Sequence, residues 1–303
     1  MLCIRAATHV ARFRNNKRER PFAPQAATGS SLGTMDEVEE IESRQSPSGK
    51  IVFEAIALEG EEELERSSAA LAWSGLAAGL SMGFSMVAEG LLATYLPDAD
   101  WRPLIAKLGY SVGFVIVILG RQQLFTENTL TPILPLLKQR TARMFANVMR
   151  LWSVVLIANL VGALAVGAVA VNTAAFDPDV QQSFIEIGRK AIEHDFGTVF
   201  LRAIFAGWLI ALMVWLLPFA ESARVAVIVL ITYVVGLGQF AHIIAGAVEV
   251  SALAASGSAT WWEVISRFII PTLFGNIVGG VLLVAMLNYA QVVAGEEESS
   301  PRQ

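Results

Sequence analysis

The sequence predicts an all-α integral membrane protein with six transmembrane helices in two inverted repeats of three, each containing one broken helix. Three observations predict this class. Of the 303 residues, 54% are hydrophobic and 16% are charged, whereas about a quarter of a soluble chain is charged. The mean hydropathy is +0.55. The apolar residues gather into six segments, each judged against the roughly 20 residues that a helix needs to cross a bilayer.

The chain before the first apolar segment divides into two parts. Residues 1–50 are polar, with Gly, Ser, Pro and mixed charge, so we expect a disordered cytoplasmic tail. Its basic start lacks the apolar core of a secretory signal and fits either a transit peptide or a tail upstream of a natural start at Met35. Residues 51–66 mix apolar positions with the acidic run EGEEELER, which indicates an amphipathic helix at the membrane surface or a solvated linker helix.

The transmembrane domain is expected over residues 67–292, followed by a short polar cytoplasmic tail at 293–303. Four of the apolar segments are continuous, and the second and fifth are interrupted. The six segments span Ser67–Leu96, Leu104–Leu137, Phe145–Val171, Phe196–Leu217, Ala223–Leu253 and Trp261–Val292.

Basic residues near the ends of the segments predict the orientation. Lys138, Arg140 and Arg143 follow the second segment, on the same side as Lys50 and Arg66 before the first. Loops that contain basic residues stay preferentially in the cytoplasm. Both termini are therefore expected there.

The two interruptions occupy matching positions, the middle segment of each half. The second segment breaks at RQQLFTENTLTP and the fifth at GLGQFAHIIAG. Broken segments at corresponding positions point to an inverted repeat with a site near the bilayer midplane. Irregular backbone survives at that depth only where protein or a water-filled cavity surrounds it. Both breaks are therefore expected inside the bundle.

Polar side chains within the breaks are the candidate functional residues. His242 is the one histidine inside an apolar segment, where an ionisable group needs a partner or a function. It could hold a hydrogen bond or pass a proton, or it could be a neutral core histidine bonded to a backbone carbonyl. Thr126 lies in the other break, where Glu127 and Asn128 follow it. We expect Thr126 both to cap a half-helix and to line a pore.

Other polar residues in apolar segments admit two interpretations. Glu89 and Glu249 could relay protons, or they could make interfacial or inter-subunit contacts. Asn159, Asn276 and Asn288 are expected to tie helices together by hydrogen bonds.

Several function classes are disfavoured. The net charge of −5 gives no basic balance for nucleic acid. Cys3 is the one cysteine, so no internal disulfide or cysteine metal site is possible, and no metal or cofactor is expected. One intramembrane histidine without an HExxH or GxSxG motif argues against a membrane enzyme. A membrane scaffold with a closed pore stays open as an alternative.

Five stretches of the chain resemble the formate/nitrite transporter family, and together they cover most of residues 67–292. They are LGYSVGFVIVILGRQQLFTENTLTPILP, NLVGAL, FLRAIFAGWLIALMVW, GQFAHIIAG and PTLFGNIVGGVLLVAMLNYAQ. The resemblance implies an aquaporin-like fold and a homopentamer, embedded in lipid, with one pore per subunit. It implies a bacterial inner membrane location and small monovalent anions as substrates: formate, nitrite, hydrosulfide or a short carboxylate.

The resemblance also implies site residues. Thr126 matches the family's loop threonine that faces the central histidine, and His242 matches that histidine. Glu127 and Asn128 are the neighbouring break residues. The positions at or near apolar constrictions match Tyr110, Phe114, Leu124 and Phe125, and Val235 falls where formate channels carry a phenylalanine.

The chain departs from the family pattern in the vestibule. Gly207 stands where the family usually has an asparagine, and Ala241 replaces an acidic residue before the histidine. Lys190 or Arg189 is the expected vestibule cation.

The expected mechanism recruits the anion with this cation, protonates it where a lowered dielectric raises its pKa, and passes the neutral acid through apolar constrictions. The alternative is a pore of the same fold for small neutral solutes.

Overall fold

The computed structural model describes residues 47–299, so the expectations for residues 1–46, including a start at Met35, and for residues 300–303 fall outside it. All regular elements in the described range are helices. They are α2 (Gly49–Glu65), α3 (Ser68–Tyr95), α4 (Arg102–Ala106), α5 (Tyr110–Leu119), α6 (Ile133–Gln139), α7 (Ala142–Asn172), α8 (Pro178–Ala191), α9 (Phe196–Leu216), α10 (Arg224–Leu237), α11 (Ile243–Ala255), α12 (Trp261–Val264), α13 (Ile270–Ile277) and α14 (Leu287–Ser299). Short 3-10 turns lie at Lys107–Gly109, Glu127–Thr129, Leu217–Phe219 and Glu221–Ala223, and π-helical turns lie at Ile265–Ile269 and Val278–Met286.

Five helical stretches in the described range are long and apolar enough to cross a membrane. They are Ser68–Tyr95, Arg102–Leu119, Ala142–Asn172, Phe196–Phe219 and Trp261–Gly295. The fifth predicted segment is instead divided between α10 and α11, of 14 and 13 residues. At 1.5 Å per residue, neither half spans a hydrocarbon core of about 30 Å alone.

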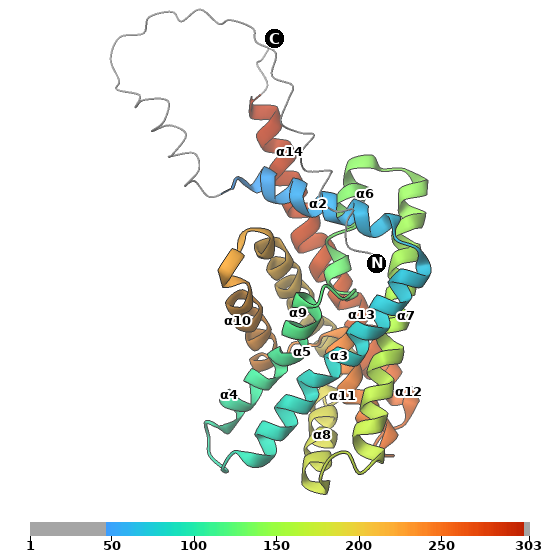
Figure 1. The fold of residues 1–303 in the computed structure, drawn as a ribbon, viewed down its shortest axis with the longest axis vertical. Coiled ribbons are helices and arrows are strands. Elements are labelled where there is room, and N and C mark those ends of the chain that lie inside the picture. Colours follow the sequence, from blue (N-terminus) through green and yellow to red (C-terminus); the bar gives the residue numbers. More distant parts are fainter. Residues whose placement is uncertain (1–46, 300–303) are drawn as a thin grey trace, which may run out of the picture. The chain divides into compact units, whose positions relative to one another are not determined.

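The surface helix α2 lies across one end of the bundle, and α8 lies at the opposite end (Figure 1). We call these ends the α2 face and the α8 face. Ser48 caps the start of α2 by accepting the Ile51 N–H. Phe53, Ile56 and Leu64 are buried, while several acidic side chains of α2 stay near the surface. The amphipathic pattern of the sequence therefore seats α2 on the bundle by its apolar side.

The same close backbone contact occurs once in each half of the bundle. A Cβ atom at Gly79 of α3 would collide with the backbone of Asn159 on α7, and one at Gly207 of α9 would collide with the backbone of Asn276 on α13. Only glycine lets these helices approach so closely. Because each half has three crossings, the second half starts from the opposite face. The repeat is therefore inverted, as the sequence predicted.

This contact corrects one expectation. Gly207 was expected in the vestibule, but it is buried at the α9–α13 contact and lines no part of the α8-face cavity described below. A side chain here has no space, so the asparagine that the family usually carries cannot be accommodated in this arrangement of helices.

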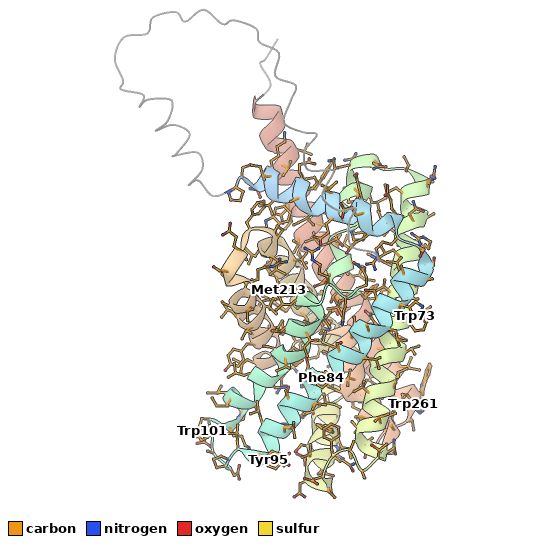
Figure 2. The ribbon with its side chains drawn as sticks, viewed as in Figure 1. Trp73, Phe84, Tyr95, Trp101, Met213 and Trp261 are labelled. Carbon is orange, nitrogen blue, oxygen red and sulfur yellow. The ribbon has the colours of Figure 1, made fainter. Side chains whose placement is uncertain are left out.

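Large aromatic side chains point outward around the bundle (Figure 2). Trp73 is 73% exposed and Phe84 is 52% exposed in the single chain. Tyr95 and Trp101 are exposed near the α8 face, where amphipathic rings favour the headgroup region of a bilayer. The outer surface is thus suited to lipid or to neighbouring subunits.

Candidate functional site

The first half-helix ends in the same way at both breaks. Gly120 and Gly238 donate their N–H groups to Ile116 O and Val234 O, each at 2.9 Å. The next residues, Arg121 and Gln239, both have φ near +49°, the left-handed conformation that commonly stops a helix. Two segments 118 positions apart therefore leave the helix along the same path.

One asparagine then clamps each break with the same three hydrogen bonds. Asn159 of α7 donates to Gly75 O and Gln123 O and accepts the Phe125 N–H. Asn276 of α13 donates to Ala203 O and Ala241 O and accepts the Ile243 N–H. These bonds satisfy backbone groups that the interrupted helices leave free.

The clamp fixes which residues are equivalent in the two halves. Leu124 lies between the two clamped groups of the first break, and His242 lies between those of the second. The repeat therefore relates a leucine to the histidine. Asn288, the third asparagine expected to tie helices, bonds instead to Val284 O within its own helix.

His242 and Thr126 meet at the centre of the bundle. His242 Nε2 lies 2.7 Å from Thr126 Oγ1, and both residues are buried. His242 also caps α11, because its Nδ1 accepts the Ala245 N–H at 3.2 Å. With Nδ1 occupied as an acceptor, a neutral imidazole carries its proton on Nε2 and donates it to Thr126 Oγ1. The Thr126 hydroxyl oxygen is then the acceptor of this bond.

The capping role expected for Thr126 is wrong. Thr126 precedes the 3-10 turn Glu127–Thr129, but its side chain makes no capping hydrogen bond there. The hydroxyl is directed to His242 instead, and Thr129 Oγ1 donates to the Thr126 carbonyl at 2.7 Å.

An apolar barrier surrounds this pair. On α5, Tyr110 lines a cavity open to the α8 face and Ile118 lines one open to the α2 face. Phe114 lies one helical turn from each, is fully buried and lines neither cavity. Its ring contacts the His242 ring edge-on, with centroids 4.9 Å apart. Phe114 therefore separates the two cavities beside the central histidine.

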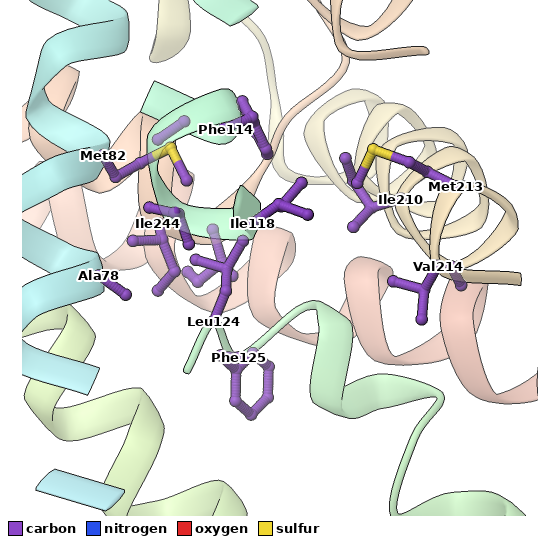
Figure 3. Packing of buried hydrophobic residues seen from close by; sticks show 14 of the residues in the cluster. Ala78, Met82, Phe114, Ile118, Leu124, Phe125, Ile210, Met213, Val214 and Ile244 are labelled. Carbon is purple, nitrogen blue, oxygen red and sulfur yellow. The ribbon is translucent and has the colours of Figure 1, made fainter. Parts of the chain in front are cut away.

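Other predicted constriction residues contribute unequally. Leu124 is fully buried and gathers with Ile118 and Ile244 (Figure 3). Phe125 points away from this group and packs against Trp152 of α7, with ring centroids 5.7 Å apart. Val235 lines the α8-face cavity rather than the barrier. The constriction is therefore predicted mainly at Phe114 and Leu124.

The α8-face cavity has a volume of about 510 Å³ and reaches from the surface to His242. Lys190 of α8 lines it, whereas the neighbouring Arg189 is exposed elsewhere. Besides Arg102 and His194, two basic residues of this cavity were missed by the sequence analysis. They are Lys107 and Arg202, each placed inside or beside an apolar segment, which is the signal that identifies them.

The α2-face cavity has a volume of about 610 Å³ and is lined by both acidic and basic side chains. Glu127 lines it, and Asn128 Nδ2 donates to Gln123 Oε1 at 3.0 Å beside it. Glu63 of α2 accepts hydrogen bonds from Gln123 Nε2 at 2.8 Å and Thr131 Oγ1 at 2.7 Å. Burial nevertheless raises the pKa of Glu63 above its usual range. The surface helix is therefore bonded directly to the first break.

No group of three His, Cys, Asp or Glu side chains within residues 47–299 is arranged to hold a metal. The polar groups at the centre are instead one imidazole, one hydroxyl and backbone atoms. Such groups can exchange hydrogen bonds with a small molecule, and because His242 Nε2 donates to the Thr126 hydroxyl, the imidazole is not placed as a base for that hydroxyl.

Comparison with known proteins gives a consistent result. The family model for the formate/nitrite transporters matches residues 50–290. The chain is 40% identical to the inner membrane protein YfdC of Escherichia coli K12 over 254 residues, which cover 84% of this chain and 82% of that protein. It is 23% identical to the formate channel BtFdhC of Bacillus thuringiensis over 79% of this chain and 93% of that protein.

Two solved structures share the fold. A pentameric formate channel with formate bound superposes with a TM-score of 0.62 at 21% identity, covering 75% of this chain and 98% of that one. An ion channel of the same family gives a TM-score of 0.69 at 17% identity, covering 80% and 99%. The six-span architecture with two broken helices is thus common to all three chains.

Proposed function

The chain belongs to the formate/nitrite transporter family, and from this premise we propose that it carries small monovalent anions together with a proton. The proposed substrates are formate, nitrite, hydrosulfide or another short carboxylate. The observation that carries the proposal is the Thr126–His242 hydrogen bond of 2.7 Å, set beside a fully buried phenylalanine between two opposed cavities.

The cavities and the barrier have different tasks in this mechanism. Basic side chains of the α8-face cavity, among them Lys190 and Arg202, attract an anion from solution. The bare ion does not cross Phe114 and Leu124, because transfer of an ionised group into apolar surroundings is very costly. After it gains a proton, the neutral acid passes and is stabilised by hydrogen bonds at Thr126.

His242 supports this passage as a hydrogen-bond donor of fixed orientation. Its cap bond to Ala245 holds the ring, and its Nε2–H holds Thr126. An imidazolium here would need its Nδ1 proton to displace the Ala245 N–H, and it would bind an anion too tightly for rapid release.

We further propose that five such chains assemble in a bacterial inner membrane, with both termini in the cytoplasm. The relatives described above are an inner membrane protein and a pentameric channel, and the exposed apolar side chains of the outer surface fit both lipid and subunit contacts. A detergent-corrected mass of five chains is expected, and a mass of one or two chains would count against the assembly.

The test is uptake by proteoliposomes that contain the purified protein. We expect saturable uptake of formate or nitrite that increases as the pH falls, and much slower uptake of glycerol. Thr126→Val should slow formate uptake by at least about tenfold, since a lost hydrogen bond at a buried site costs about 1–3 kcal/mol. Thr173→Val changes an exposed threonine at the end of α7 and should have no effect. Glycerol uptake as fast as formate uptake would favour the pore for neutral solutes.

A further inference from the structure

A second polar cluster lies in the α8-face cavity, apart from the Thr126–His242 pair. Glu89 of α3, Lys107 of the following 3-10 turn and Glu249 of α11 all line this cavity. Lys107 Nζ lies 2.5 Å from Glu89 Oε1, and the Glu89 side chain is 6% exposed. The charges of both groups act on the Glu249 carboxyl group. Three separate segments therefore bring two carboxyl groups to one ammonium.

The cluster is incomplete as it stands. Glu89 Oε2 is buried and has no hydrogen-bond partner among the residues that the structure describes. A buried charged oxygen without a donor is unfavourable, because it loses its hydration and gains nothing in return. Two carboxylates around one ammonium also leave one negative charge unbalanced, and that charge would repel an anion. One proton held by the two carboxyl groups removes the imbalance.

The position of the cluster connects it to the central site. His242, Gly246 and Glu249 follow one another at spacings of four and three residues on α11, and all three line the same cavity. Residues at these spacings share one helix face. Glu249 therefore lies about 10 Å from His242 along the helix axis, at 1.5 Å per residue. A molecule that leaves the cluster toward the α2 face meets the histidine next.

Other titratable groups also face this cavity. They are Arg102 on α4, Tyr110 on α5, Asp179, Glu186 and Lys190 on α8, His194 after α8, and Arg202 on α9. Arg102 is paired with Asp98 at 3.1 Å. The remaining basic groups attract an anion, whereas Glu89 is the carboxyl group paired with Lys107 and Glu249 is the carboxyl group on which the charges of both act.

We propose that Glu89, Lys107 and Glu249 form a proton-loaded subsite that binds a small carboxylate anion and gives it the proton with which it crosses the barrier. This inference rests on the proposed function and names its proton donor. Lys107 and the protonated Glu249 donate hydrogen bonds to the two oxygens of the anion. Glu89 is a positioning residue that holds the ammonium in place.

The transfer step balances without any further reactant. The O–H bond of Glu249 breaks, its proton forms an O–H bond with a carboxylate oxygen of the substrate, and the neutral acid departs toward His242. Glu249 is left as a carboxylate. A proton taken from the solution on the α8 face then returns to Glu249 through water in the cavity, which opens to that face. Each turnover thus moves one proton with one anion.

The experiment compares Glu249→Gln and Glu89→Gln with Glu186→Gln, a matched loss of one carboxylate from the same cavity. Uptake of labelled formate into proteoliposomes is measured at about pH 7.5. Both test variants should slow uptake by at least about tenfold. Glu249→Gln removes the acid that supplies the proton, and Glu89→Gln removes the carboxylate that holds Lys107 and shares the proton. The control should retain the wild-type rate. Glu249→Asp keeps the acid, and its rate should lie nearer to the wild-type rate than that of the Gln variant.

A second experiment, infrared spectroscopy, tests for the bound proton without any substrate. Infrared pH-difference spectra of the purified protein should show the C=O band of a protonated carboxyl group at neutral pH. Each test variant should lose the part of this band that comes from the cluster, whereas Glu186→Gln should keep it. Wild-type uptake rates, or an unchanged band in Glu249→Gln, would overturn the inference. A wild-type protein that carries no formate but shows the band would refute the proposed function alone.

Discussion

The asparagine clamps make the sharpest prediction about stability. Asn276→Ala removes three hydrogen bonds, two of them to the second break. Hydrogen bonds between helices in membranes contribute about 0.6 kcal/mol each on average, which gives about 2 kcal/mol for three. Ala241 O and Ile243 N–H also lose a partner at buried positions, at about 1–3 kcal/mol each. The two estimates describe the same bonds and are not added, so the expected loss of stability is about 2–6 kcal/mol.

The chain offers both an equivalent substitution in the other repeat and a control for this variant. Asn159→Ala breaks the matching three bonds in the first half, so its loss should agree within about 1 kcal/mol. Asn288→Ala removes only a bond within one helix and should change stability by less than about 0.5 kcal/mol. The free energy of unfolding is measured in mixed micelles with increasing denaturing detergent. If Asn276→Ala is as stable as Asn288→Ala, the clamp does not stabilise the break.

Three further predictions concern packing, pH and orientation. Gly207→Ala should prevent normal folding, because its Cβ would collide with the backbone of Asn276, whereas Gly295→Ala has open space around it and should elute like the wild type from a sizing column. The raised pKa of Glu63 means that the folded state binds its proton more tightly than the unfolded state, so this contribution to stability is present at low pH and is lost as the pH rises through the folded pKa. Thermal unfolding at about pH 5 and pH 8 should therefore differ less in Glu63→Gln than in the wild type, and an equal difference would exclude this role. A cysteine at exposed Ala142, in a chain without Cys3, should resist a membrane-impermeant reagent added to intact cells, and rapid labelling from outside would reverse the proposed orientation.

The breaks were predictable because membrane physics leaves few other places for them. Hydropathy located the apolar segments, and a polar run inside an apolar segment has to be enclosed by protein. Two such runs at matching positions then indicated that Thr126 and His242 face one another, and the structure places them 2.7 Å apart. The role of the Thr126 hydroxyl was not predictable in detail, because capping and pairing use the same oxygen.

The residues of the α8-face cavity were harder to predict from the sequence, for physical reasons. Gly207 was assigned there by correspondence with other chains, but the local helix approach, not the correspondence, determines what that position contacts. Lys107 resembled an ordinary loop charge, because Glu89, its partner, lies 18 positions earlier on another helix. A linear pattern does not show that two charges of opposite sign meet in a cavity.

The duplicated asparagine clamp assigns two tasks to different residues. The asparagines hold the broken backbone, and other side chains line the pore. Backbone geometry at both breaks is held from outside, by Asn159 and Asn276, and of the two equivalent side chains His242 adds a cap bond to α11 whereas Leu124 has no polar atom to add one. One position carries an imidazole and its counterpart an isobutyl group, and the pore is therefore chemically one-sided on a framework that is almost the same on both sides. The histidine of one half can therefore hold Thr126 of the other half by a hydrogen bond, which its leucine counterpart cannot do. A change at Leu124 can consequently alter the lining of the pore while both asparagine clamps and the cap of α11 stay in place.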